Sequence, residues 1–134
     1  SRLSGAQVVT DKGSAMGGKF GIKFKRNLSE AGWILAVNNN INTITAAHIH
    51  CGEAGVNGGV VFPLFSGSFT APSGMVANGI VRNSDFSTPA SCGSHTNINN
   101  VASFMAAMMD DVFYVNVHTG VFPGGEVRGQ LWGH

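Results

Sequence analysis

The strongest constraint on the fold is a series of short stretches in which apolar residues alternate with polar or small ones. Turn-forming segments rich in glycine, asparagine and proline separate these stretches. Alternation with a period of two is typical of strands that bury one face, and regularly spaced short strands indicate a sandwich or a barrel. We therefore expect an all-β fold, a Greek-key-like antiparallel β-barrel or sandwich of about eight strands. The predicted strands cover residues 4–10, 19–26, 32–38, 43–50, 59–65, 75–82, 111–118 and 126–132.

One segment departs from this pattern. In residues 97–111, "NINNVASFMAAMMDD", the apolar residues Val101, Phe104 and Met108 recur at helical spacing, and the asparagines before them can cap a helix. We expect one short amphipathic helix here, packed across the barrel.

The length and composition fit one compact domain. The chain has 134 residues, and neither an internal repeat nor a linker is evident in it. Its 19 glycines and its charged fraction of only 11% are typical of a turn-rich β protein. We expect residues 1–134 to form a single domain that can bury a core of its own.

Charge and hydropathy exclude two classes of partner. Eight basic residues face seven acidic ones, so no basic surface of the kind that binds nucleic acid is expected. The basic residues of 19–26 alternate with Phe20, Ile22 and Phe24, which predicts a strand with a charged outer face. No apolar run approaches the roughly 18 residues of a membrane-spanning helix, so we expect no membrane span.

Two histidines stand one residue apart in "TAAHIHCGEAG", residues 45–55. In a strand, His48 and His50 share one face, with Cα atoms roughly 6.6 Å apart, while Ile49 takes the opposite face. If Ile49 points into the core, both imidazoles point outward. They could converge on one metal ion, or they could be two polar residues on a solvated face.

Two later strands place further polar side chains on an outward face. In "FYVNVHTG", Val115 and Val117 form one face and His118 lies on the other. In "GGEVRGQLW", Arg128 alternates with apolar neighbours in the same way. The segment "TGVFPGG" between them is short enough for a hairpin, and pairing of His118 near Glu126 would bring Arg128 to the same face. The expected outer set is therefore His48, His50, His118 and Arg128.

The two cysteines, Cys51 and Cys92, fit one disulfide, two free thiols or metal ligands. Cys51 points with Ile49, away from the histidine face, which favours the disulfide. A disulfide in turn favours an oxidising compartment.

The chain resembles the CHRD domain family, first described in chordin and widespread in bacterial secreted proteins. The motifs that carry the resemblance are "LSGAQVV", "ITAAHIHCGEAGVNGGVVFPLF" and "FYVNVHTGVFPGGEVRGQL", which together span nearly the whole chain. The resemblance implies a β-barrel or sandwich in an extracellular setting, and it implies no single function.

The histidine pattern also resembles that of copper/zinc superoxide dismutases. This second resemblance implies that His48, His50 and His118 are copper ligands and that Arg128 guides a small anion such as superoxide. The segment "GEAGVNGGVVFP" contains no histidine, so a zinc site is not expected and a copper-only site remains. His95 is the candidate fourth ligand, and a Cys51–Cys92 disulfide would bring it closer.

These observations lead to one hypothesis with two alternatives. The hypothesis is a secreted or periplasmic β-barrel that binds one copper ion, with zinc less favoured, and that dismutates superoxide. Three imidazoles suit copper, which binds such sites most tightly in the first-row series and can cycle between two oxidation states. The alternatives are a copper carrier or store without turnover, and a metal-free adhesion or assembly module. The sequence also leaves a homo-oligomer open.

Overall fold

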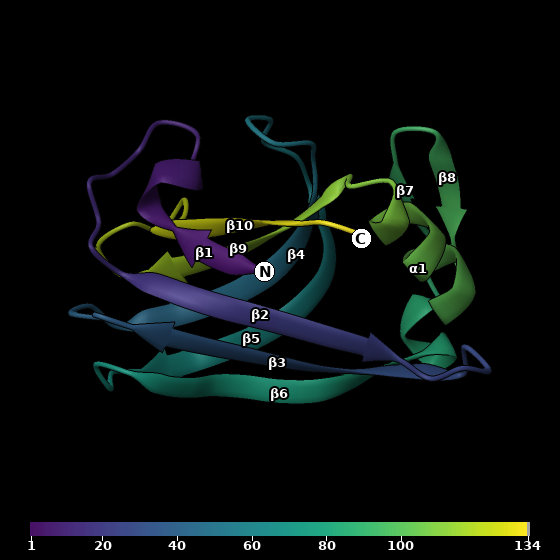
Figure 1. The fold of residues 1–134 in the computed structure, drawn as a ribbon, viewed down its shortest axis with the longest axis horizontal. Coiled ribbons are helices and arrows are strands. Elements are labelled where there is room, and N and C mark those ends of the chain that lie inside the picture. The colour runs from purple at the N-terminus through teal and green to yellow at the C-terminus, as the bar shows by residue number, and fades with distance from the viewer. Residues whose placement is uncertain (134) are drawn as a thin grey trace.

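The structure, a computed structural model, describes residues 1–133 and is built mainly from antiparallel strands (Figure 1). One sheet has eight strands in the order β5-β4-β9-β10-β1-β2-β3-β6, and a separate hairpin pairs β7 with β8. The sheet curls into a nearly closed barrel whose two edges, β5 and β6, meet without pairing. The predicted all-β antiparallel barrel with one short α-helix is thus confirmed. The strands are β1 (Arg2–Ser4), β2 (Gly17–Phe24), β3 (Glu30–Asn38), β4 (Ile44–Cys51), β5 (Val60–Phe69), β6 (Gly74–Arg82), β7 (Ala90–Cys92), β8 (His95–Ile98), β9 (Phe113–Thr119) and β10 (Val127–Leu131).

The predicted strand over residues 4–10 is wrong. β1 ends at Ser4, and a short 3₁₀ turn, η1 (Gly5–Gln7), follows it. The reason is a side chain that takes the place of a strand partner. Gln7 Oε1 accepts a hydrogen bond of 3.0 Å from the backbone N–H of Gln130 on β10, while Gln7 Nε2 donates to the carbonyl of Arg2 at 3.0 Å. The other seven predicted strands are present, with ends shifted by up to four residues.

The predicted helix over 97–111 is shorter than expected. Helix α1 runs from Val101 to Met109, and residues 97 and 98 of the predicted range belong to β8. Asn100 is its N-cap, and its side chain accepts a hydrogen bond of 2.8 Å from the N–H of Ser103. Together with the β7–β8 hairpin and a second 3₁₀ turn, η2 (Asn83–Phe86), α1 lies over one end of the barrel (Figure 1).

The barrel interior is apolar, as the alternation predicts. Ile49 on β4, Val115 and Val117 on β9 and Val127 on β10 have no exposed surface, and Phe104 of α1 closes one end of the core against Phe113. The predicted disulfide is present and joins Cys51, at the end of β4, to Cys92 of the β7–β8 hairpin. Within residues 1–133, every helix is too short or too polar to cross a membrane.

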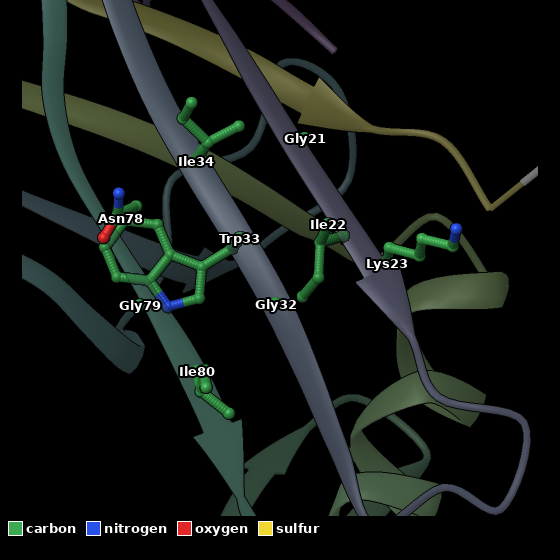
Figure 2. A pocket seen from close by; sticks show the side chains of 9 residues that line it. All are labelled: Gly21, Ile22, Lys23, Gly32, Trp33, Ile34, Asn78, Gly79 and Ile80. Atoms are coloured by element: carbon green, nitrogen blue, oxygen red, sulfur yellow. The ribbon is translucent and has the colours of Figure 1, made fainter.

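The outer face of β2, β3 and β6 is bare. Gly21, Gly32, Ile34 and Ile80 line a shallow pocket there, and the two isoleucines are 47% and 42% exposed (Figure 2). Lys23 lies beside them on β2, which matches the charged outer face expected for that strand. This pocket has few polar groups and none of them converge, so it does not suggest a chemical site.

The outer face of β4, β9 and β10 is covered. The covering loop, residues 52–59 between β4 and β5, folds back over these strands and contacts them through its backbone. Here the sequence-based expectation of an outer set open to solvent is wrong for His50 and Arg128, whereas His48 and His118 remain partly exposed. His50 is only 9% exposed and Arg128 only 2%. The physical reason is that alternation decides which face of a sheet a side chain takes, but a loop decides whether that face meets water.

Candidate metal centre

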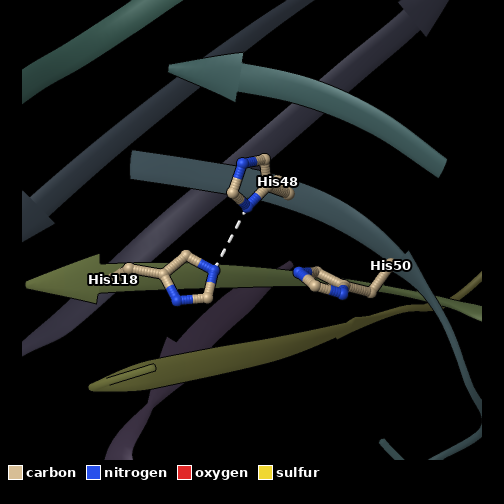
Figure 3. A group of neighbouring side chains, drawn as sticks. All are labelled: His48, His50 and His118. Carbon is tan, nitrogen blue, oxygen red and sulfur yellow. Dashed lines mark hydrogen bonds between the residues drawn. The ribbon is translucent and has the colours of Figure 1, made fainter. Parts of the chain in front are cut away.

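Two neighbouring strands position three histidines on the covered face. His48 and His50 lie on β4, and His118 lies on β9, its partner strand. The register places His50 opposite Tyr114 and His48 opposite Asn116. Because Ile49 is fully buried inside the barrel, its two neighbours point to the outer face, as predicted. Figure 3 shows the three imidazole rings turned toward a common point.

The three rings are close enough to share one ion. Each offers one ligand atom, and these atoms all lie within 4.8 Å of one another. The ring centroids are 5.6 Å apart for His48 and His50, 5.1 Å for His48 and His118, and 5.9 Å for His50 and His118. Imidazole nitrogens bound to one ion at 2.0–2.1 Å lie within about 4.2 Å of each other. The group therefore needs at most a small contraction to bind a metal.

Backbone carbonyls set the tautomers of two of the rings. His50 Nδ1 donates to the carbonyl of Gly58 at 2.9 Å, and His118 Nδ1 donates to the carbonyl of Pro123 at 2.9 Å. Each Nε2 is then left with a lone pair, the form in which histidine binds a metal. His48 Nδ1 lies 3.2 Å from His118 Nε2 and supplies the proton between them. A metal ion could take the place of that proton once His48 carries its own proton on Nε2.

One ligand atom is left without any partner. His50 Nε2 is buried and makes no hydrogen bond within the described structure. A buried acceptor without a partner is costly, so proteins retain one chiefly where something else satisfies it. A metal ion bound by the three histidines would do so.

Burial keeps the cluster neutral. It lowers the pKa of His48, and the nearby charges of His118 and His50 lower it further. Burial also lowers the pKa of His50 and of His118, against the opposing effect of their hydrogen bonds to Gly58 and Pro123. Neutral imidazoles are the form that binds metal ions, so the cluster is ready to act as a ligand set near pH 7.

Arg128 lies on the same face but does not reach the histidines directly. The register matches the expectation, since Arg128 pairs with Asn116 of β9. Its guanidinium stands 3.4 Å from the centre of the Tyr114 ring, and Nη2 donates to the carbonyl of Glu53 at 2.8 Å. We expected Arg128 to be exposed and to guide an anion. Its side chain is instead buried beneath the covering loop.

His95 is not one of the three grouped histidines. It lies on β8, and its Nε2 stands 2.7 Å from Asp110 Oδ2. The disulfide does join its hairpin to the end of β4, but the hairpin turns this imidazole toward Asp110.

The sequence analysis did not predict the role of two residues at the centre. Tyr114 stacks on His50 with 5.0 Å between ring centroids and 11° between ring planes, and Gly58 supplies the carbonyl that orients His50. Alternation along β9 places Tyr114 on the face of His118, so its position was readable from the sequence although its role was not. Gly58 acts through its backbone, for which the sequence carries no signal.

The CHRD domain family model matches residues 1–131 of the chain. No curated protein and no solved structure gives a match.

Proposed function

We propose that this chain, which belongs to the CHRD domain family, is a copper-binding domain whose single ion is held by His48, His50 and His118. The observation that carries the proposal is the convergence of three imidazoles, one of which has a buried Nε2 without a hydrogen-bond partner. A set of three solvated strand histidines would not leave an acceptor buried without a partner.

The ligand chemistry favours copper. Imidazole nitrogen suits copper, zinc, iron and nickel, and divalent copper binds such ligands most tightly in the first-row series. The three histidines are the only such group of metal-ligating side chains within residues 1–133. Zinc remains the less favoured occupant of the same three imidazoles.

The reaction we propose for the site is superoxide dismutation. Bound copper would supply one-electron transfer to and from superoxide, so that two superoxide ions and two protons give one dioxygen and one hydrogen peroxide. The chain's own part is to hold the ion through His48, His50 and His118. The carbonyls of Gly58 and Pro123 fix the tautomers of two of these ligands. We assign Arg128 the task of making the potential near the site more favourable to an anion.

A copper carrier without turnover is the second candidate, and one observation favours it. Arg128 is 2% exposed, and three neutral acceptors, including Gln130 Oε1 at 3.2 Å, occupy its guanidinium. So little of this guanidinium is exposed that an anion arriving from solvent has poor access to its remaining N–H groups.

We also propose an extracytoplasmic location, secreted or periplasmic, for a single domain over residues 1–134. The Cys51–Cys92 disulfide supports it, since disulfides persist in oxidising compartments. The family adds support, because CHRD domains are of extracellular type.

Copper titration followed by electron paramagnetic resonance tests the metal proposal. The wild type should take up one cupric ion per chain with a nitrogen-rich spectrum, and His50→Ala should lose both. His95→Ala tests the predicted fourth ligand, since it changes the spectrum only if His95 contributes. Equal stoichiometry and spectrum in the wild type and His50→Ala would refute the site, and no uptake at all would favour a metal-free adhesion or assembly module.

A superoxide assay of the copper-loaded protein separates the enzyme from the carrier. Turnover well above that of free copper at the same concentration, reduced in Arg128→Met, is the result expected of the enzyme. Turnover no faster than that of free copper identifies the carrier.

A further inference from the structure

Three adjacent strands each contribute one side chain to a stack. His50 of β4 lies 5.0 Å from Tyr114 of β9, with ring planes only 11° apart, and Arg128 of β10 lies 3.4 Å from the centre of the same tyrosine ring. Since β9 lies between β4 and β10 in the sheet, Tyr114 separates the imidazole from the guanidinium. The order of the stack is therefore metal ligand, phenol ring and cation.

The backbone of Gly58 clamps the first two members together. Its carbonyl accepts from His50 Nδ1 at 2.9 Å and from the Tyr114 hydroxyl at 3.3 Å, and its N–H donates to that hydroxyl at 3.0 Å. A Cβ at residue 58 would lie 1.7 Å from the carbonyl oxygen of Cys51, so only glycine brings the loop this close to β4. The orientation of His50 thus depends on Tyr114 and Gly58 at once.

The third member carries a charge that no carboxylate within residues 1–133 neutralises. Arg128 donates to the carbonyl of Glu53 and, at 3.4 Å, to Asn57 Oδ1, both in the covering loop. The acid–base contacts within residues 1–133 are Lys25–Glu30, Arg82–Glu30 and His95–Asp110, and none of them involves Arg128. A buried cation in a region of low dielectric acts on nearby charges far more strongly than an exposed one.

We propose that Tyr114 and Arg128 are positioning residues of the metal centre: Tyr114 fixes the plane of His50, and the charge of Arg128 biases the bound ion toward its less positive state. The inference rests on the proposed function. A fixed positive charge one ring away destabilises cupric copper more than cuprous copper, because repulsion grows with the charge of the ion. In this role Arg128 affects the oxidation state of the metal through its charge, with Tyr114 and His50 lying between the guanidinium and the ion. It does not contact a substrate.

Reduction potentials of the copper-loaded protein test the role of the charge. Arg128→Met keeps an unbranched side chain, though a shorter one, and removes its charge, so the ratio of cuprous to cupric affinity should fall about tenfold, which is about 59 mV for one electron. Lys23→Met is the matched control, because it removes the same charge from the bare face of β2. Its potential should equal that of the wild type.

Two further variants keep the test decisive. Arg128→Lys retains the charge without the planar stack, so its potential should stay near that of the wild type even if Arg128→Met folds poorly. Tyr114→Phe keeps the ring and removes the hydroxyl. It should weaken copper binding by about 10–100-fold, as loss of an outer hydrogen-bonding partner does, and change the cupric spectrum.

The two ways of failing are distinguishable. If the wild type binds no copper at His48, His50 and His118, the proposed function fails and the inference fails with it. If the wild type binds copper but Arg128→Met and Lys23→Met share its potential, the tuning role of Arg128 is overturned while the metal site stands. If Tyr114→Phe leaves affinity and spectrum unchanged, the role of the Tyr114 hydroxyl in holding Gly58 against His50 is overturned, because the stacked ring is still present.

Discussion

The two outer faces of the barrel sheet have the same backbone geometry but opposite surroundings. On β2, β3 and β6 the outward residues include Gly21, Gly32, Ile34 and Ile80, and no segment of residues 1–133 covers them. On β4, β9 and β10 most outward residues are polar, and residues 52–59 cover His50, Arg128 and Gln130. The difference teaches that an outward direction along a strand is not the same as contact with solvent.

Burying a polar face has a cost, and the covered face meets it with hydrogen bonds. Gln130, 3% exposed, donates from Nε2 to the carbonyl of Gly52 at 3.0 Å and to that of Asp111 at 2.8 Å. Within residues 1–133, the buried side-chain atoms without a hydrogen-bond partner are His50 Nε2 and Asn116 Oδ1. Both belong to the covered face of β4 and β9, so the unsatisfied polar atoms gather at the candidate metal centre and not on the bare face.

The largest expected change in stability comes from removing the disulfide. This bond is attached to β4, a strand of the covered face, and has no counterpart on the bare face. Removing it in Cys51→Ser/Cys92→Ser frees a loop of sequence separation 41, which should lower the free energy of unfolding by about 4 kcal/mol. Ile34→Ser on the bare face should change it by no more than about 0.5 kcal/mol, because that side chain is already largely exposed. Denaturant unfolding measures both values. An equal loss of unfolding free energy in the two variants would contradict the expected difference in stability between the covered and the bare side.

The second-largest expected effect is on copper affinity, compared between a variant of the covered face and a variant of the bare face. His118→Ala removes a direct ligand and should weaken copper binding more than about 100-fold, since even an outer partner of a ligand is worth 10–100-fold. Lys23→Ala on the bare face should leave the dissociation constant unchanged. Competition with a copper chelator measures both, and comparable affinities in the two variants would place the ion elsewhere.

A pair of glycine substitutions tests the cover itself. Gly58→Ala drives a methyl group into the Cys51 carbonyl and should cost about 1–3 kcal/mol of stability, together with copper affinity. Gly32→Ala lies on the bare face, where an added Cβ meets nothing within 4 Å, so it should be neutral or slightly stabilising. Thermal unfolding with and without copper reports both. A Gly58→Ala protein as stable as Gly32→Ala would mean that the loop does not need its close approach to β4.

The smallest effect is a pH dependence of the metal-free protein. Burial lowers the pKa values of His48, His50 and His118 below the ordinary 6.5, so below pH 6.5 the unfolded chain binds more protons than the folded one. Their contribution to stability is therefore complete above pH 6.5 and is lost as the pH falls toward the folded-state values. The melting temperature should drop between about pH 7 and about pH 5, and less so in His118→Gln. Lys23→Gln on the bare face should retain the full pH dependence, and a pH dependence unaltered by His118→Gln would argue against the histidines as its source.

Sequence reasoning located much of the fold and of the candidate centre. Seven of the eight predicted strands are present, and alternation around Ile49 and Val117 placed His48, His50 and His118 on one face. It missed the β7–β8 hairpin, whose strands of three and four residues are too short to show a period. It also extended the first strand through Gln7, where a side chain competes with the backbone for Gln130.

The sequence by itself determined which residues share a face, because a period of two is a local property of an extended chain. Only the tertiary structure decided that this face is covered, that Gly58 and Pro123 set the tautomers, and that Tyr114 stands between His50 and Arg128. Those contacts join β4, β9, β10 and a loop through backbone carbonyls and ring faces. Such groups are present at nearly every position of a chain, so only their arrangement in space makes them specific.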